Sequence, residues 1–461
     1  MPIEESLLYS SNVVFFQYSL AIMMTTTALL AFVLIWFVGA DGFTTFLQRL
    51  KVPAMTSNSW WDDLAPPFTI EHSNEDWNHE QEDVVHFCFL VHGHRGLSKD
   101  LSYLQAVMQS LSEREKRKRY QKDGMVHDIV VHSAVCNERK TTDGVACGGQ
   151  RLVDEMLSVI TAKMQDRTST TVTISVVGNS LGGIYGRYAI ARLARENLHF
   201  NIFCTTATPH LGVSKHTYLP LPRSAEIGVA HAMGNTGKDL FRLNNLMKDM
   251  ATTPEYILPL GAFRKRIAYA NAFGTDFPVP AETAAFLSDQ STYPHHFIVE
   301  NDVVVDEGGL VIARLHTPPA SDDVDISAIA TEHTDELVQM STALDALGWK
   351  KVFVDIRKEI PIKIPMGRRN SQSDSGSEAE ETSLDNLRRK KVVASRDLAT
   401  AIKLDSSEGL HLPMAHNMIV AFSRSRISTF VNKGGRPIVD ALAKELVEDI
   451  FSWKEEVKTA P

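Results

Sequence analysis

Short apolar runs that alternate with helical patterns constrain the fold of this chain more than any other feature. Between residue 84 and about residue 315 these runs are continuous and rich in Val, Ile and Phe. Continuous apolar character is typical of strands buried on both faces, and the helical stretches supply the crossovers between parallel strands. The sequence therefore predicts an α/β fold with a mostly parallel central sheet. The predicted strands are Val84–Val91, Ile129–Ser133, Val172–Val177, Phe200–Thr206, Arg266–Ala270 and, further on, Lys351–Ile356.

The pentapeptide Gly178-Asn179-Ser180-Leu181-Gly182 has the spacing G-x-S-x-G. In this arrangement a serine occupies a sharp strand-to-helix turn, and side chains two residues to either side would clash, so glycines are required there. The context agrees, because Val172–Val177 precedes the serine and Ile184–Leu198 has a helical pattern. A turn without chemistry stays the alternative, since so short a pattern also arises by chance. The sequence predicts Ser180 as a nucleophile.

The loop His92-Gly93-His94-Arg95-Gly96 directly follows the first predicted strand. Acyl transfer needs two backbone N–H donors aimed at the developing oxyanion. We expect one from Leu181, just after the nucleophile, and the other from this loop, with the N–H of His94 as first choice. A glycine-rich turn with two surface histidines is an equally good interpretation of the loop taken alone. A metal site at His92 and His94 is not favoured, because no third ligand has a suitable spacing.

The catalytic acid and base are expected to follow the serine in the order Ser, Asp or Glu, His. Two acids fit by position, Asp276 and Asp302, since each follows an apolar run. A solvated loop carboxylate is an equally good interpretation of either. Among the later histidines we favour His416, which precedes the apolar, strand-like run Met418–Phe422, and His411 is the nearest rival.

Several segments resemble the serine esterase family of eukaryotic lipase-like proteins, often described as a domain of unknown function. The most specific is Ala-Thr-Pro-His-Leu-Gly, which follows a predicted strand. The resemblance implies an α/β-hydrolase fold and lipase-like activity. It covers roughly residues 84–450 outside one insertion, in the segments Phe89–Gly93, Lys140–Gly149, Val177–Leu193, Ala207–Val213, Tyr269–Ala284 and His416–Ile419.

The resemblance also favours one of the two acids. In such lipases the catalytic acid lies in the pattern Ala-Asn-x-x-x-Asp-x-x-Val-Pro-x-x-Thr. A similar run surrounds Asp276, with one additional residue between Asn271 and the acid, so Asp276 is preferred to Asp302. The chain departs from the family at Asn179, where a histidine is usual before the nucleophile. That departure bears on the substrate, because this residue takes no part in the proton relay.

These residues together predict a serine esterase or lipase that hydrolyses acyl esters of lipids. His416 would take the proton from Ser180, Asp276 would orient the imidazole, and the amides of Leu181 and His94 would hold the oxyanion. This mechanism requires no cofactor and no metal. Two alternatives stay open: a thioesterase or small-ester hydrolase of the same fold, and a non-catalytic, membrane-anchored interaction protein.

The N-terminal region carries no charged residue from Ser6 to Ala40. This run exceeds the roughly 20 residues that span a bilayer, so we expect one transmembrane helix, with cleavage near Ala40 as the alternative. Acids precede the run, whereas Arg49 and Lys51 follow it. The positive-inside bias therefore predicts a single-pass membrane protein whose catalytic part faces the cytoplasm.

The rest of the chain divides by composition. We expect a membrane anchor at 1–50, a linker at 51–83 and a hydrolase core at 84–366, with a helical cap around 212–260. The cap segment could equally consist of packing helices. A Ser/Glu/Arg-rich insertion at 367–391 is predicted to be disordered, because it has almost nothing to bury. Residues 392–461 then complete the core with His416 and an amphipathic helix at Pro437–Phe451. The net charge of −9 gives no reason to expect a nucleic-acid partner.

Overall fold

The computed structural model describes residues 84–124, 126–165, 170–193, 198–216, 221–298, 309–321, 326, 333–360, 384–403 and 415–453. The chain divides into two compact units, Met1–Leu64 and Ala65–Pro461, and every described residue belongs to the second. The predicted membrane anchor and linker thus lie outside the described residues. Within the described part, no helix is both long enough and apolar enough to cross a membrane.

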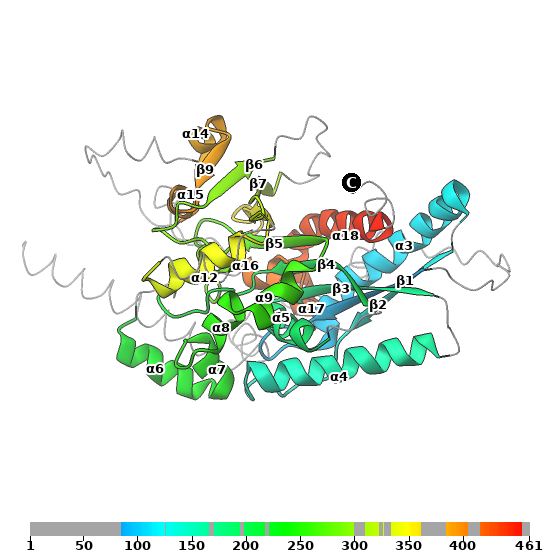
Figure 1. Cartoon of the computed structure of the whole chain (residues 1–461), viewed down its shortest axis with the longest axis horizontal. Helices are drawn as coiled ribbons and strands as arrows, with labels where there is room; N and C mark the ends of the chain where they lie inside the picture. The colour runs from blue at the N-terminus through cyan, green and yellow to red at the C-terminus, as the bar shows by residue number, and fades with distance from the viewer. Residues whose placement is uncertain are drawn as a thin grey trace, which may run out of the picture. The chain divides into compact units, whose positions relative to one another are not determined.

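All six predicted strands are present in one sheet (Figure 1). They run parallel in the order β2-β1-β3-β4-β5-β8. Every residue of β1 is buried, as expected for a strand that is covered on both faces. The prediction of an α/β fold with a mostly parallel sheet is therefore confirmed. The strands are β1 (Val84–Val91), β2 (His127–Ser133), β3 (Thr171–Asn179), β4 (Leu198–Thr206), β5 (Lys265–Asn271) and β8 (Lys350–Val354).

Three further strands, which the sequence pattern did not predict, extend the sheet beyond β8. β7 (Val311–His316) is antiparallel to β8, β6 (Pro294–Phe297) is antiparallel to β7, and β9 (Val392–Ala394) is antiparallel to β6. β6 and β7 carry His and Arg among their apolar residues, and β9 is only three residues long. None of the three therefore has the long, continuous apolar run that identifies the parallel strands.

The predicted disorder of 367–391 is wrong for its last residues. Helix α14 (Leu384–Arg389) leads through a turn directly into β9. Leu387 is buried in a hydrophobic cluster that includes Val393 and Leu398. A few well-spaced leucines are enough to anchor this helix, although its average composition is polar. Residues 361–383 lie outside the described part of the chain.

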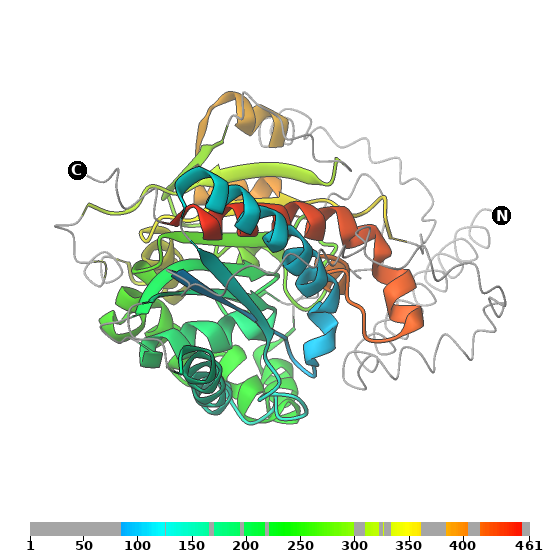
Figure 2. The same cartoon turned by 90° about the vertical axis from the view of Figure 1, so that its right-hand side faces the viewer.

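Helices cover both faces of the sheet (Figures 1 and 2). On one face, α3 (Ser102–Asp123) and α18 (Arg436–Phe451) pack side by side, and on the other α4 (Val145–Met164) packs against α5 (Leu181–Leu193). The amphipathic helix predicted at the C-terminal end is therefore confirmed as α18. Its buried residues recur every three or four positions, which places them on the stripe that faces the core: Ile438, Val439, Leu442, Leu446 and Ile450.

Four helices follow β4 in the segment predicted as a cap. They are α6 (Arg223–Ala232), α7 (Gly234–Leu240), α8 (Leu246–Thr252) and α9 (Pro254–Gly261). Asp239 of α7 accepts a hydrogen bond from Val145 N at the start of α4 at 2.7 Å, and Met250 O of α8 accepts one from Arg187 of α5, also at 2.7 Å. Such buried hydrogen bonds to the core favour the interpretation as packing helices over a mobile lid.

The remaining helices have ten residues or fewer. They are η3 (Ser98–Leu101), α10 (Ala281–Ala284), α12 (Glu336–Asp345), α15 (Ser395–Ala401), α16 (Ala415–Met418), α17 (Arg426–Asn432) and η4 (Lys433–Gly435). The prediction that Met418–Phe422 resembles a strand is wrong. Met418 ends α16, and the residues that follow form a turn. Its side chains are buried all the same, and this burial explains the apolar pattern.

Candidate active site

Ser180 lies between the carboxyl end of β3 and the first turn of α5. Its φ of +55° belongs to the left-handed region, which residues other than glycine rarely adopt. The surroundings hold this conformation: Ser180 N donates to Thr206 O at 2.9 Å, and Thr208 Oγ1 donates to Ser180 O at 2.9 Å. The predicted strand–turn–helix context is therefore present, with a strained backbone at the serine itself.

The glycines of the pentapeptide are required by close backbone approaches. A Cβ atom on Gly178 would lie 2.3 Å from the Cα of Gly183, and one on Gly182 would lie 2.1 Å from the carbonyl oxygen of Val91. Both contacts are far inside van der Waals distance and involve backbone atoms that cannot rotate away. This packing places the serine against the end of β1, where the His92–Gly96 loop begins.

The loop after β1 contacts the serine through Gly93. A Cβ atom at this position would lie 2.7 Å from the Cβ of Ser180 and 3.1 Å from its Oγ, so only glycine fits. His94 follows at once, and burial together with the charge of Arg95 lowers the pKa of its ring to about 4. That ring is therefore neutral near pH 7. Leu181 is the first residue of α5, so its N–H has no partner within the helix.

Asp276 and His416 are brought together by the fold, although 140 positions separate them. The Nδ1 atom of His416 lies 3.0 Å from Oδ2 and 3.1 Å from Oδ1 of Asp276. The carboxylate is fully buried and also accepts hydrogen bonds from Asn271 Nδ2 at 2.7 Å and from Val279 N at 3.0 Å. An imidazole held through Nδ1 by a buried carboxylate is the arrangement of the base and acid in a catalytic triad.

The histidine segment is fixed to the loop that carries the acid. Ala415 N donates to Thr275 O at 3.0 Å. Ala415 directly precedes His416, and Thr275 directly precedes Asp276. The His416 side chain is 15% exposed, and Ala415 and Met418 of α16 are buried in the core. The hydrogen bonds between described residues include none that joins Ser180 Oγ to the His416 ring. The structure thus pairs Asp276 with His416.

A buried ion pair joins the segment after His416 to the loop after β1. The guanidinium of Arg424 meets the carboxylate of Asp100 through Nε at 3.0 Å and Nη2 at 2.7 Å, and the same Nη2 donates to Arg95 O at 2.8 Å. Asp100 is almost completely buried. This bidentate contact, which we call the Arg424–Asp100 clamp, holds the proposed oxyanion loop against the histidine segment.

The sequence did not predict the clamp or the role of Asn271. Asn271 stood in the family pattern around Asp276, and that pattern was the available signal for a residue that orients the acid. The clamp had no such signal, because its two members lie 324 positions apart. The rivals Asp302 and His411 lie outside the described residues, so the structure does not compare them with Asp276 and His416.

Two further polar residues near the serine have structural partners. Asn179, which replaces the usual histidine, accepts a hydrogen bond from Thr206 Oγ1 at 3.0 Å. His210 is fully buried, contacts Thr205 Oγ1 at 3.0 Å, and has its pKa lowered well below the usual range by burial. No group of three or more His, Cys, Asp and Glu side chains in the described ranges is arranged to hold a metal ion.

Comparison with known proteins agrees with the class of the site. The family model described as "Putative serine esterase (DUF676)" matches residues 81–288, and it confirms the resemblance over that segment. The matched segment includes Ser180 and Asp276 and ends before His416. A search of curated proteins finds no match.

Solved structures similar to this chain include two hydrolases. Phospholipase PlaB from Legionella pneumophila in complex with thio-NAD is 13% identical, with a TM-score of 0.30, over 57% of this chain and 61% of that protein. The peroxisomal alpha-beta-hydrolase Lpx1 from Saccharomyces cerevisiae is 12% identical, with a TM-score of 0.26, over 44% of this chain and 66% of that protein. The chain thus covers less than two thirds of either protein.

Proposed function

We propose that this chain is a serine hydrolase that cleaves acyl ester bonds of lipids, with Ser180, His416 and Asp276 as its catalytic triad. The observation that carries the proposal is the Asp276–His416 hydrogen-bonded pair, in a chain whose one G-x-S-x-G serine occupies a strained strand-to-helix turn. The match to a serine esterase family supports the coarser conclusion, a lipase-like hydrolase.

The reaction follows from the roles of these groups. His416 Nε2 accepts the proton of Ser180 as Oγ forms a bond to the ester carbonyl carbon, and Asp276 stabilises the resulting imidazolium. The carbonyl oxygen becomes an oxyanion, which the amides of Leu181 and His94 would hold. His416 then gives its proton to the leaving alcohol as the ester bond breaks. Water, activated by the same histidine, attacks the acyl-enzyme and releases the fatty acid and the serine.

The preference for lipid substrates rests on the N-terminal sequence. An uncharged run from Ser6 to Ala40 is long enough to span a bilayer, and an enzyme tethered to a membrane meets lipids at high local concentration. As a further part of the proposal, the chain spans a membrane once with its catalytic part on the cytoplasmic side. The few charges that flank the run support this orientation.

An acyl-chain series distinguishes the lipid substrate from the alternatives. The full chain in non-ionic detergent would be given p-nitrophenyl esters from acetate to palmitate, and the matching acyl thioesters, with Ser180→Ala as the blank. A lipase has a kcat/KM that rises with chain length and prefers the oxygen ester. The highest kcat/KM for acetate, or for the thioesters, would contradict the lipid-ester assignment but retain the hydrolase. If no activity depends on Ser180, both the lipid-ester assignment and the hydrolase assignment are contradicted.

A further inference from the structure

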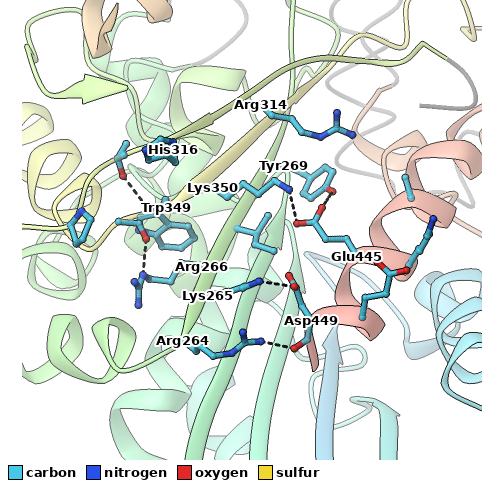
Figure 3. Close-up of a pocket in the computed structure, with 17 residues that line it drawn as sticks. Arg264, Lys265, Arg266, Tyr269, Arg314, His316, Trp349, Lys350, Glu445 and Asp449 are labelled. Carbon is cyan, nitrogen blue, oxygen red and sulfur yellow. Dashed lines mark hydrogen bonds and ion pairs between the residues drawn. The ribbon is translucent and has the colours of Figure 1, made fainter. Parts of the chain in front are cut away.

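A cavity lies at the edge of the sheet opposite the candidate active site. Ser180 follows the carboxyl end of β3, whereas Lys265 and Lys350 begin β5 and β8. These strands are parallel, so their amino ends share the other edge. A cavity of about 550 Å³ opens there between the strand ends and α18 (Figure 3). Its volume is in the range of small-molecule sites, roughly 300–1,000 Å³.

The walls of this cavity, which we call the basic cavity, carry an excess of positive charge. Three carboxylates line it, all from α18: Glu445, Glu448 and Asp449. Six basic side chains also line the cavity, five from β5, β7 and β8 or their ends and one from α18, which leaves a formal excess of three positive charges in a chain whose net charge is −9. The basic residues are Arg264, Lys265, Arg266, Arg314, Lys350 and Lys444.

Two of the carboxylates are already engaged by lysines of the wall. Asp449 pairs with Lys265 at 2.6 Å, and Glu445, one helical turn earlier, pairs with Lys350 at 2.8 Å. In Figure 3 each lysine points from a strand end towards its carboxylate on α18. They fix the two lysines in position. The other four basic residues of the wall outnumber the remaining carboxylate, Glu448.

Arg266 contributes a positive charge that backbone oxygens stabilise. Its guanidinium donates to the carbonyl oxygens of Gly348, Gly261 and Phe263. Burial lowers the pKa of Arg266 to about 10, so it stays protonated near pH 7. Carbonyl oxygens satisfy hydrogen bonds without cancelling the charge, and an anion that entered the cavity would gain Coulomb energy from it.

We propose that the basic cavity binds a phosphate-bearing ligand. Phosphate suits these walls because it carries up to two charges, and its oxygens match the donor geometry of guanidinium and ammonium groups. The phosphate could belong to a free soluble compound or to a phospholipid headgroup, which present the same chemistry to the cavity. The ligand would not compete with an ester substrate, because β5 separates the two sites: it begins at Lys265 and ends at Asn271, beside Asp276.

Calorimetric titration tests the proposal on the full chain carrying Ser180→Ala, so that no probe is hydrolysed and the result does not depend on the proposed activity. The probes are inorganic pyrophosphate and short-chain dihexanoyl phosphatidic acid. We expect saturable binding that weakens as salt is raised, since the attraction is between charges. Tighter binding of pyrophosphate would indicate a soluble ligand, and tighter binding of the phosphatidic acid would indicate a headgroup.

Charge reversal locates the binding. Lys444 is exposed on α18, so Lys444→Glu changes the charge of the cavity without opening the core, and it should weaken binding about tenfold. The matched control Lys390→Glu reverses an exposed lysine in the turn after α14, outside the cavity, and should bind as the parent does. If Lys444→Glu destabilises the fold, Arg314→Gln, which removes one charge from the wall, takes its place. No saturable binding, or equal affinity in cavity and control variants, would overturn the proposal.

Discussion

Replacing Arg424 by glutamine should destabilise the protein and lower its turnover, because the Arg424–Asp100 clamp joins two loops of the candidate active site. The substitution removes a charge whose side chain is only 15% exposed, opposite a carboxylate that is 3% exposed. It also removes the hydrogen bond to Arg95 O. The histidine segment and the oxyanion loop then lose their direct polar connection.

The loss of stability depends on the hydrogen bonds that the Asp100 carboxylate keeps after the substitution. Removing one partner of a buried ion pair costs about 3–5 kcal/mol when the other charge is left without compensation. Asp100 keeps one hydrogen bond, from Leu97 N at 2.7 Å, and Arg424 is not completely buried. We therefore expect a loss at or just below this range, about 2–3 kcal/mol of unfolding free energy. The double variant Arg424→Gln with Asp100→Asn removes both charges and should recover a large part of it.

Equilibrium unfolding in urea measures this loss, with kcat for a chromogenic ester as the second readout. The matched control is Arg396→Gln, because Arg396 is 56% exposed and its contact with Asp397 is 3.6 Å. An exposed pair of this kind contributes less than about 1 kcal/mol. A loss for Arg424→Gln as small as that of the control would refute the reasoning. So would a double variant whose loss equals the sum of the two single losses.

Three other expectations concern the acid, the N-terminus and pH. Asp276→Asn should lower kcat by about 10⁴, as loss of the orienting carboxylate does in serine proteases, whereas Asp302→Asn should have little effect; the reverse order would identify the other acid. The full chain should stay with membranes after a carbonate wash and be released without residues 1–50, and release of the full chain would count against a spanning helix. Burial alone would raise the pKa of Glu155, but hydrogen bonds from His132, Cys136 and nearby backbone lower it to about 2. Its stabilising contribution is complete above its ordinary pKa of 4.5 and is lost as pH falls towards 2, so Glu155→Gln should make acid unfolding less steep over that range; an unchanged slope would rule this out.

The sequence was sufficient for the parts of the fold that depend on local patterns. The buried parallel strands have continuous apolar runs, and the serine turn has glycines at positions where a Cβ atom would strike backbone. In the antiparallel strands, polar residues interrupt the apolar pattern of β6 and β7, and β9 has only three residues. Their place in the sheet depends on pairing with one another and with β8.

In the candidate site, too, the features with a local sequence pattern could be predicted and the others could not. Ser180 could be predicted from its own neighbours, and a family pattern selected Asp276 over Asp302. The clamp could not be predicted, because an arginine and an aspartate 324 positions apart have no common local pattern. The helix α14 was missed for a related reason: average composition described the segment as polar, while burial of Leu387 decided its structure.

Labelling of the full chain by a fluorophosphonate probe tests the central claim most directly, because the probe reacts only with an activated serine. Three proteins would be compared: the native chain, Ser180→Ala, and Ser452→Ala, which removes a serine at the end of α18 whose hydroxyl donates to Asp449 O of the same helix. The account predicts labelling and ester hydrolysis in the native chain and in Ser452→Ala, and neither in a folded Ser180→Ala. Full labelling of Ser180→Ala, or an unlabelled but folded native chain, would contradict the assignment of Ser180 as the nucleophile.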